Sequence, residues 1–348
     1  MKPFILTRLA VVLAPLMVCG DLLAQETTTP VGVVKITVSG APSGGTRLSV
    51  IAASLRRAVL QQGQASSLDS FVGGDTPSQA LHTGATGWAA DQWTAEPHLC
   101  YLENAQGAEE AYLIIGNTAS GELVLSTLFD LQTRYPASPS YRICRANTLG
   151  SLFGTGTVPF LTQASASNAD NVYAWNGSSW TTYHHNGTSW QSPATVFGGN
   201  ANDTVIYPDE GLFVLRRAEE DLVITLSGTV PDKQQISTVA GDQLTFVSSR
   251  YPVGTTLNNL GFQQLSGWQT DGSASNADVV YLWDGGSGTW TSYWHNGSSW
   301  QSPATVFGGN ANNDIIPAGT ALFVLRRSTS SPEDSANTHP LPYQPHTP

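Results

Sequence analysis

The chain has little charge of either sign and no long apolar run after its first residues. Charged residues make up 12% of the 348 residues, about half the share usual in globular proteins. Acidic residues outnumber basic ones by 26 to 15. The chain therefore lacks the basic patch with which a nucleic-acid binder displaces counterions. No later apolar stretch approaches the roughly 20 residues that a membrane helix needs. We therefore expect no nucleic-acid partner and no transmembrane anchor.

Cysteine is also scarce, with 3 residues in the whole chain. Cys19 directly follows the first apolar stretch, which leaves Cys100 and Cys144 for the rest of the protein. An even count in an exported chain makes a disulfide between these two plausible. Two buried thiols would account for the same residues. Both interpretations stay open at this point.

Signatures of known enzymes are missing as well. There is no Gly-x-Ser-x-Gly elbow, His-Glu-x-x-His motif, phosphate loop or dinucleotide fingerprint. His184-His185 corresponds to Trp294-His295 in a second copy described below, so a metal pair would exist in only one of them. The stretch from Gly198 to Val205 is similar to a calcium-binding nonapeptide, but a Gly-Gly turn with Asn caps explains the same residues. We predict no catalytic residue, cofactor or metal.

The first residues have the pattern of an export signal. Lys2 and Arg8 precede an apolar run from Leu9 to Val18, and Ala24 offers a small residue for cleavage before Gln25. Cys19 raises the alternative of a lipid anchor, but the branched Val18 before it fits that poorly. We expect an exported protein in the periplasm, at the cell surface or outside the cell.

An internal repeat dominates what is present. The stretch from Ser165 to Arg217 recurs from Ser273 to Arg327, and both copies end in LFVLRR. Residues 190–202 are identical to residues 300–312. Such repeats fix the architecture before any other signal does, and this one indicates tandem modules.

Turn residues inside the repeat predict a β-meander. Strands from Val172 to Trp175, from Trp180 to His185 and from Ser189 are separated by Asn176-Gly177 and Asn186-Gly187. Asn-Gly supplies the positive φ angles that a type I′ hairpin turn requires. The pattern therefore predicts three antiparallel strands in each repeat.

Two further strands follow from comparing the copies. The stretch from Val33 to Gly40 (VVKITVSG) matches LVITLSG from Leu222, as if the same strand occurred twice. The stretch from Leu48 to Ala53 has a helical apolar pattern, but its counterpart after Gln243 is β-branched, so we predict a strand. The fold class expected is all-β, mainly antiparallel, with tandem β-meander or β-sandwich-like modules.

These patterns divide the chain into five parts. They are a signal peptide (1–24), a diverged N-terminal β module (25–120), a first β repeat module (121–230), a second (231–327), and a disordered Ser/Pro-rich tail (328–348).

Aromatic residues concentrate in the repeats. On a flat sheet face such rings stack against sugar rings, but they also stabilise small sheets by cross-strand packing. Packing is the favoured interpretation. The candidate ligand-binding aromatics are Trp180, Tyr183, Trp190, Trp290, Tyr293 and Trp300.

Several ordered motifs resemble an uncharacterised family of exported bacterial proteins found mainly in Verrucomicrobia. They are TTTPVGVVKITV after the signal, the Ser140 to Ile143 strand, TLGSLFG from Thr148, the Asn-Ala-Asp start of each repeat, the HNG-x-SW turn, Ile-Pro-Ala-Gly at Ile316, and LPY at Leu341. The stretch from Ile206 to Gly211 departs from the Ile-Pro-Ala-Gly pattern. The resemblance implies no activity, cofactor or catalytic residue.

Taken together, the sequence predicts an exported, non-enzymatic β-repeat protein with a structural or interaction role. Its partner would be an unidentified protein or glycan. The alternative is a carbohydrate-binding module that uses the repeated Trp and Tyr faces.

Overall fold

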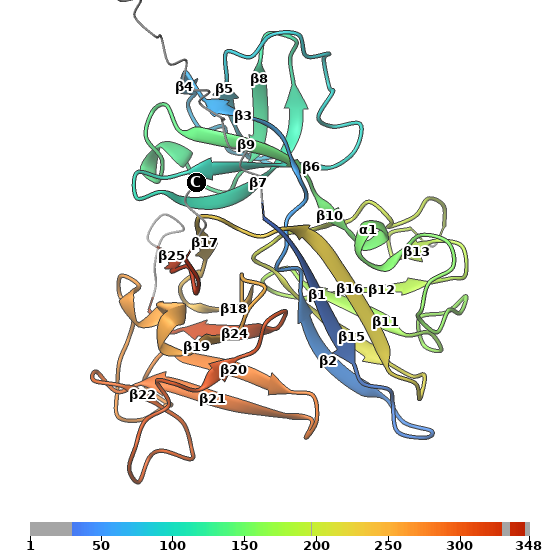
Figure 1. Ribbon diagram of the computed structural model, residues 1–348, viewed down its shortest axis with the longest axis vertical. Coiled ribbons are helices and arrows are strands. Elements are labelled where there is room, and N and C mark those ends of the chain that lie inside the picture. The colour runs from blue at the N-terminus through green and yellow to red at the C-terminus, as the bar shows by residue number, and fades with distance from the viewer. Residues whose placement is uncertain (1–29, 196, 329–334, 345–348) are drawn as a thin grey trace, which may run out of the picture. The chain divides into compact units, whose positions relative to one another are not determined.

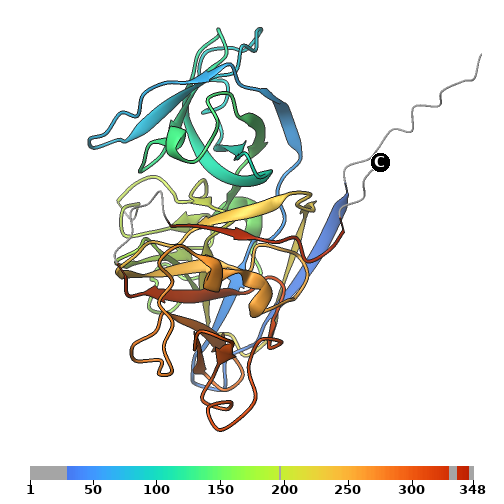
Figure 2. The same cartoon turned by 90° about the vertical axis from the view of Figure 1, so that its left-hand side faces the viewer.

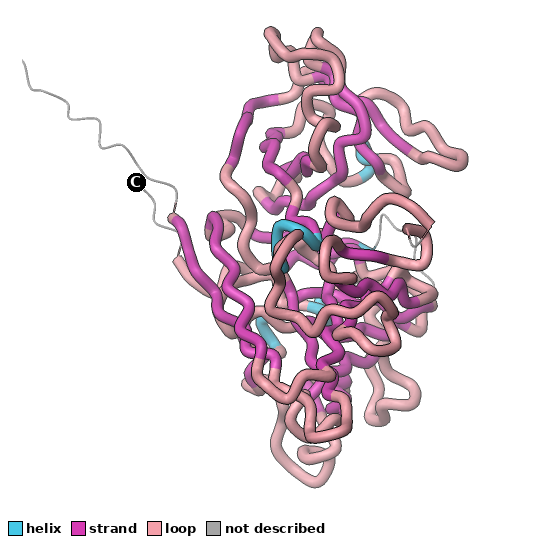
Figure 3. The backbone as a smooth tube through the Cα atoms, turned by 90° about the vertical axis from the view of Figure 1, so that its right-hand side faces the viewer, coloured by secondary structure: helices cyan, strands magenta, loops and turns pink. Residues whose placement is uncertain are grey.

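Strands are the dominant regular element of the protein (Figure 3). Nearly all of them pair antiparallel, as the sequence predicts. The computed structural model describes residues 30–195, 197–328 and 335–344. The elements are β1 (Val31–Val38), β2 (Arg47–Ala52), β3 (Val59–Gln64), β4 (Ser67–Leu68), β5 (Ser78–His82), β6 (His98–Glu103), β7 (Ala108–Asn117), β8 (Glu122–Ser126), η1 (Leu131–Thr133), β9 (Ser140–Arg145), β10 (Asn147–Thr148), α1 (Leu149–Phe153), β11 (Asn171–Trp175), β12 (Trp180–His185), β13 (Trp190–Gln191), β14 (Val205–Ile206), β15 (Gly211–Arg216), β16 (Leu222–Thr229), β17 (Gln234–Thr238), β18 (Gln243–Ser248), β19 (Thr255–Thr256), η2 (Asn258–Leu260), η3 (Phe262–Gln264), β20 (Val279–Asp284), β21 (Thr289–His295), β22 (Trp300–Gln301), β23 (Ile315–Ile316), β24 (Ala321–Arg326) and β25 (Ala336–His339).

The two repeats form two five-stranded sheets of the same order. The first sheet runs β13-β12-β11-β15-β2 and the second β22-β21-β20-β24-β18 (Figure 1). The predicted strand from Leu48 is confirmed as β2, and it occupies the edge that β18 occupies in the second sheet. The short pairs β10–β14 and β19–β23 are also counterparts.

The predicted three-stranded meander is confirmed, but its turns are not type I′. Trp175 pairs with Trp180, which leaves a four-residue loop at 176–179. Gly177 has φ of 96°, whereas Asn176 is not among the positive-φ residues of the described chain. Instead, Oδ1 of Asn176 accepts hydrogen bonds from the backbone N–H groups of Ser178 and Ser179. The turn is therefore stabilised by hydrogen bonds to the Asn side chain and not by the type I′ backbone conformation predicted from the dipeptide.

Each repeat has its own apolar core under one face of its sheet. Trp190 and Val172 lie fully buried in the first core, and Trp300 and Val280 occupy the same positions in the second. Alternation along the strands places these residues on one face, and burying each large side chain contributes roughly 1.5–3 kcal/mol.

A buried aspartate links the start of each repeat to its final strand. Asp170 accepts a hydrogen bond from the backbone N–H of Arg217 at 2.6 Å and forms an ion pair with the Arg216 guanidinium. Asp278 accepts the N–H of Arg327 at 2.7 Å in the second repeat. An unpaired buried charge would be costly, so the Asn-Ala-Asp and Leu-Arg-Arg motifs recur together for a structural reason.

The two repeats are related by an internal pseudo-two-fold axis. β1 and β16 form an antiparallel ribbon in which Ile36 lies opposite Ile224 (Figure 1). These two isoleucines are counterparts in the two matching segments, VKITVSG and LVITLSG. Val34 opposite Leu226 and Val38 opposite Leu222 obey the same symmetry. The two predicted copies of this strand thus pair with each other.

Contacts between the two sheets repeat that symmetry. Nε1 of Trp175 donates to the Leu244 carbonyl at 3.2 Å, and Nε1 of Trp283 donates to the Leu48 carbonyl at 2.9 Å. The sheets meet in an aromatic cluster that includes the stacked rings of Phe246 and Phe323. The strands of both repeats can be followed in a second view (Figure 2). The molecule is therefore an internal pseudo-dimer, with the aromatic cluster as its interface.

A further sheet is inserted into the first repeat between β2 and β10. It runs β3-β9-β6-β7-β8-β5-β4, and β17 joins it by pairing parallel to β7. The sequence boundary between residues 120 and 121 falls between β7 and β8, which are hydrogen-bonded neighbours. One sheet therefore spans this boundary. The division of the chain into independent domains stays a prediction.

The predicted disorder of the tail is wrong for residues 335–344. Residues 336–339 form β25, which pairs with β17, and His339 is buried. Tyr343 also donates a hydrogen bond to the carbonyl of Pro231. Backbone hydrogen bonds to β17 hold this polar segment, which has no apolar pattern from which a strand could be predicted. Residues 329–334 and 345–348 lie outside the described residues, as do the predicted signal peptide and Cys19. Within the described ranges, no helix is long and apolar enough to cross a membrane.

Candidate functional site

Four of the six candidate aromatics lie in the cores of the repeats. Trp190 and Trp300 have no exposed surface, and Tyr183 and Tyr293 are buried beside them. Nε1 of Trp190 donates to the carbonyl of Gly154 at 2.8 Å. In this structure these four rings have packing contacts and present no face on which a sugar could stack.

The other two candidates lie at the edge of the interface between the sheets. Trp180 and Trp290 are each 40% exposed. Trp180 meets the rings of Phe213 and Phe323 edge-on, and Trp290 contacts the same two phenylalanines. The structure therefore brings these two together around one cluster and separates them from the buried four.

Cys100 and Cys144 are both free, buried thiols. β6 and β9 are neighbours, and Cys144 lies opposite Leu99 rather than opposite Cys100. Because successive side chains alternate between faces, the two sulfurs belong to different apolar clusters. The structure corresponds to the alternative of two buried thiols, and the disulfide is not formed. Burial raises the pKa of the Cys144 thiol to about 11.

The repeated histidines have packing and turn contacts. Nδ1 of His185 accepts the N–H of Gly187 at 3.2 Å, and Nε2 lies 3.2 Å from the Thr155 carbonyl. His295 accepts the N–H of Gly297 in the same way. Among the described residues, no three His, Cys, Asp or Glu side chains gather to hold a metal ion.

Residues 190–195 and 197–202, and their counterparts in the identical copy 300–312, belong to loops with backbone and side-chain hydrogen bonds. Oδ1 of Asn202 accepts the N–H of Trp190 at 2.9 Å, and Asn312 does the same for Trp300 at 2.8 Å. Oγ1 of Thr195 accepts the N–H of Ser192 at 2.8 Å. Within the stretch that is similar to a calcium-binding nonapeptide, the side-chain oxygens of Asn200 and Asn202 thus accept hydrogen bonds from backbone amides.

One aromatic residue of each loop has no packing role. The side chains of Phe197 and Phe307 are both fully exposed, at 101%. The glycines that follow them, Gly198 and Gly308, have matching φ angles of 144° and 143°. Sequence reasoning missed these residues because it searched the strands. The sequence signal that could have found them is a phenylalanine at the same position of two identical loops, where a turn alone needs no large apolar residue.

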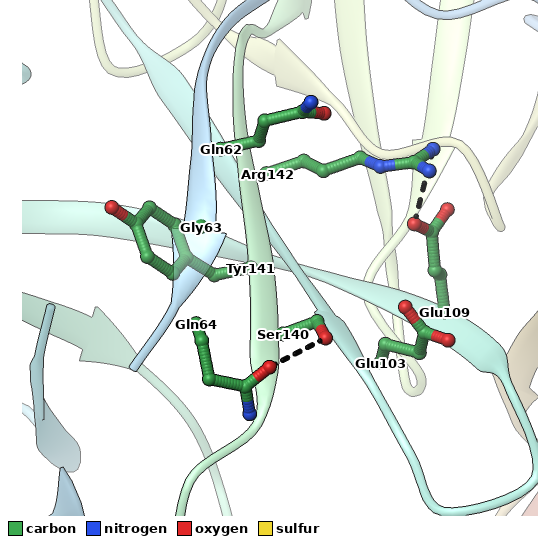
Figure 4. Close-up of a pocket in the computed structure, with 8 residues that line it drawn as sticks. All are labelled: Gln62, Gly63, Gln64, Glu103, Glu109, Ser140, Tyr141 and Arg142. Carbon is green, nitrogen blue, oxygen red and sulfur yellow. Dashed lines mark hydrogen bonds and ion pairs between the residues drawn. The ribbon is translucent and has the colours of Figure 1, made fainter. Parts of the chain in front are cut away.

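A second candidate is a polar groove on the inserted sheet. In cross-strand register, Gln64 lies opposite Ser140, Ser140 opposite Glu103, and Glu103 opposite Glu109. Figure 4 shows Gln62 and Arg142 extending to the same side as these carboxylates, while the Tyr141 ring points the other way. The polar groove is lined by Gln62, Gly63, Gln64, Glu103, Glu109, Ser140, Tyr141 and Arg142.

Ion pairs fix the charged groups of the polar groove. Glu109 is 1% exposed and pairs with Arg56 at 2.7 Å and with Arg142 at 3.3 Å. Glu103 pairs with Lys233 at 2.7 Å. Asp232 accepts from Arg142 at 2.7 Å, and hydrogen bonding to this guanidinium helps to lower the pKa of Asp232.

Two carboxyl groups, those of Asp209 and Glu210, lie in the segment of the first repeat that departs from the Ile-Pro-Ala-Gly pattern. Desolvation, and then the neighbouring Asp209, raise the pKa of Glu210 to about 8. The backbone carbonyl of Asp209 accepts the N–H of Ser248 at 2.9 Å, and its counterpart Gly319 accepts the N–H of Ala52 at 2.8 Å. The segment therefore serves the pseudo-two-fold interface.

No protein-family model, curated protein or solved structure matches this chain. Function must therefore be inferred from the chain's own geometry.

Proposed function

We propose that the protein is an exported, non-enzymatic structural protein that associates with further copies of itself through Phe197 and Phe307. The observation that carries this proposal is a fully exposed phenylalanine on a hydrogen-bonded loop, present in both repeats. A large apolar side chain left in water forgoes roughly 1.5–3 kcal/mol of burial. Hydrogen bonds within each loop already restrain the chain, which lowers the conformational entropy lost on binding.

The uncharged loops are the part of the chain at which a second copy can approach. The chain has a net charge of −11, so two copies repel each other over most approaches. The loop segment 190–202 contains no charged residue. Because both loops have the same sequence, a contact of one loop with a loop of another copy is self-complementary. Two such loops in each chain give assemblies that can extend beyond a dimer.

Sedimentation velocity of the chain from Gln25 onward tests the proposal through its valency. Burying two phenylalanines in each contact contributes roughly 3–6 kcal/mol, and the freedom of motion lost on association offsets part of it. We therefore expect a weak contact, with a dissociation constant on the order of 1 mM. We expect the wild type to form species larger than dimers as its concentration approaches this value. Phe197→Ser and Phe307→Ser should each stop at the dimer, and the double variant should stay monomeric.

A matched control separates these loops from exposed apolar surface in general. Leu128 is 81% exposed and lies in the inserted sheet's chain segment, away from both repeats in sequence. Leu128→Ser should associate as the wild type does. Wild-type protein that stays monomeric at about 1 mM would sink the proposal. A double variant that still associates would do the same.

A further inference from the structure

A second, larger hollow adjoins the polar groove and shares lining residues with it. The first hollow has a volume of about 260 Å³ and the second about 590 Å³, and both are lined by Gln62 and Arg142. The second is also lined by Gln61, Thr229 and Asp232. Together they form a site of the size range in which proteins hold small ligands.

Glutamine amides in this site have unused hydrogen-bonding capacity. Within the described ranges, the side chains of Gln61 and Gln62 form no hydrogen bond with the protein, and Gln62 lines both hollows. Each amide offers two donors and an acceptor. A hydroxyl group both donates and accepts, so neighbouring hydroxyls of a sugar match one amide at both of its atoms.

Charge balance within the site decides which sugars it suits. Arg56, Arg142 and Lys233 stand against Glu103, Glu109 and Asp232, and the ion pairs join each cation to a carboxylate. No charge is left over to attract an anionic or a cationic ligand. A charged ligand would have to compete with one of these ion pairs.

Apolar surface in the site is small. Val59 and Leu60 are the aliphatic side chains among the lining residues, and Leu60 is 47% exposed. This is too little for the apolar side chains of a peptide, but it can cover the C–H face of one sugar ring.

We propose that the polar groove and its adjoining hollow bind a neutral carbohydrate, with Gln62 as a direct hydrogen-bonding residue. The site lies on the inserted sheet, which the second repeat lacks. It differs from the Trp and Tyr faces considered from the sequence. It is also independent of self-association through Phe197 and Phe307.

Isothermal titration calorimetry with the chain from Gln25 onward tests this. The probes are the neutral hexasaccharides of glucose, xylose and N-acetylglucosamine, with hexagalacturonate as the anionic comparison. At least one neutral probe should bind more tightly than hexagalacturonate. Gln62→Leu should weaken that binding about tenfold or more. Gln163→Leu removes an exposed amide in the first repeat and should leave binding unchanged, as should Trp180→Ala.

Three results would overturn the proposal. One is no heat of binding from any neutral probe at about 10 mM, the weakest affinity that such contacts would give. Another is tighter binding of hexagalacturonate, which would mean that an unpaired cation recognises the ligand. The third is binding lost in Trp180→Ala but kept in Gln62→Leu, which would move the sugar site to the aromatic interface.

Discussion

The pseudo-two-fold axis makes a sharp prediction at Gly211, the first residue of β15. Its counterpart in the second repeat is Ala321, the first residue of β24. A Cβ atom added at Gly211 would overlap the methyl group of Ala321 and lie 2.7 and 2.8 Å from two ring carbons of Phe246. Carbon atoms pack best at about 3.5–4.0 Å, so one of these groups must move. The axis has room for one methyl group and not for two.

The cost of Gly211→Ala can be worked from these contacts. Overpacking a core with an extra methyl group costs about 1–3 kcal/mol. Gly211 does not have a positive φ, so alanine brings no backbone strain and regains about 0.4–1 kcal/mol from the unfolded state. We therefore expect a net loss of about 1–2 kcal/mol in the free energy of unfolding, measured by urea denaturation with tryptophan fluorescence.

Exchanging the two residues tests the symmetry itself. Gly211→Ala combined with Ala321→Gly restores one methyl group at the axis, so the double variant should be more stable than the two single losses predict. Recovery should be incomplete, because the methyl then meets Phe246 where its counterpart position is Val50. Gly156 has open space around it, and Gly156→Ala should stay within about 0.5 kcal/mol of wild type. Additive losses, or a Gly211→Ala variant as stable as this control, would refute the reasoning.

Two buried titratable groups predict opposite pH dependences. Burial, and then Arg250, lower the pKa of His339 from 6.5 to about 3. Between these two values the unfolded state binds a proton and the folded state does not, so stability falls as the pH drops from about 6.5 towards 3. In His339→Gln this part of the loss of stability at low pH should disappear. If urea denaturation shows the free energy of unfolding changing equally with pH in both proteins, the lowered pKa of His339 is contradicted. Glu210 has its pKa raised from 4.5 to about 8, so stability falls as the pH rises from about 4.5 to 8. Glu210→Gln should be more stable than wild type at pH above 8, and thermal melts showing no gain there would count against a protonated Glu210.

Local signals in the sequence predicted the repeat sheets because their strands are short and end at turn residues. The meander from β11 to β13 follows from its Asn-Gly dipeptides, and β2 follows from its β-branched counterpart β18. The turn type could not be predicted, because an Asn side chain can supply the hydrogen bonds that a backbone conformation supplies elsewhere.

Long-range pairing explains most of what the sequence concealed. β2 pairs with β15 across the whole inserted sheet, and no local pattern specifies a partner so distant. β25 was missed because the side chains that it buries, Asn337 and His339, are polar. Trp180 and Trp190 look alike in the sequence, but Trp190 lies in the core of its own repeat, whereas Trp180 contacts the second sheet and stays partly exposed.

The ribbon of β1 and β16 has a consequence for the order of folding. About 180 residues separate the end of β1 from the start of β16, and synthesis at roughly 5–20 residues per second takes roughly 10 to 40 s to cover them. During that time β1 has no partner, and its β-branched sequence VGVVKITV is the kind that adds to the edge of another sheet. The first strand to be synthesised is thus among the last to be paired. Until β16 is available, the nascent chain must be kept from adding β1 to the sheet edge of another chain.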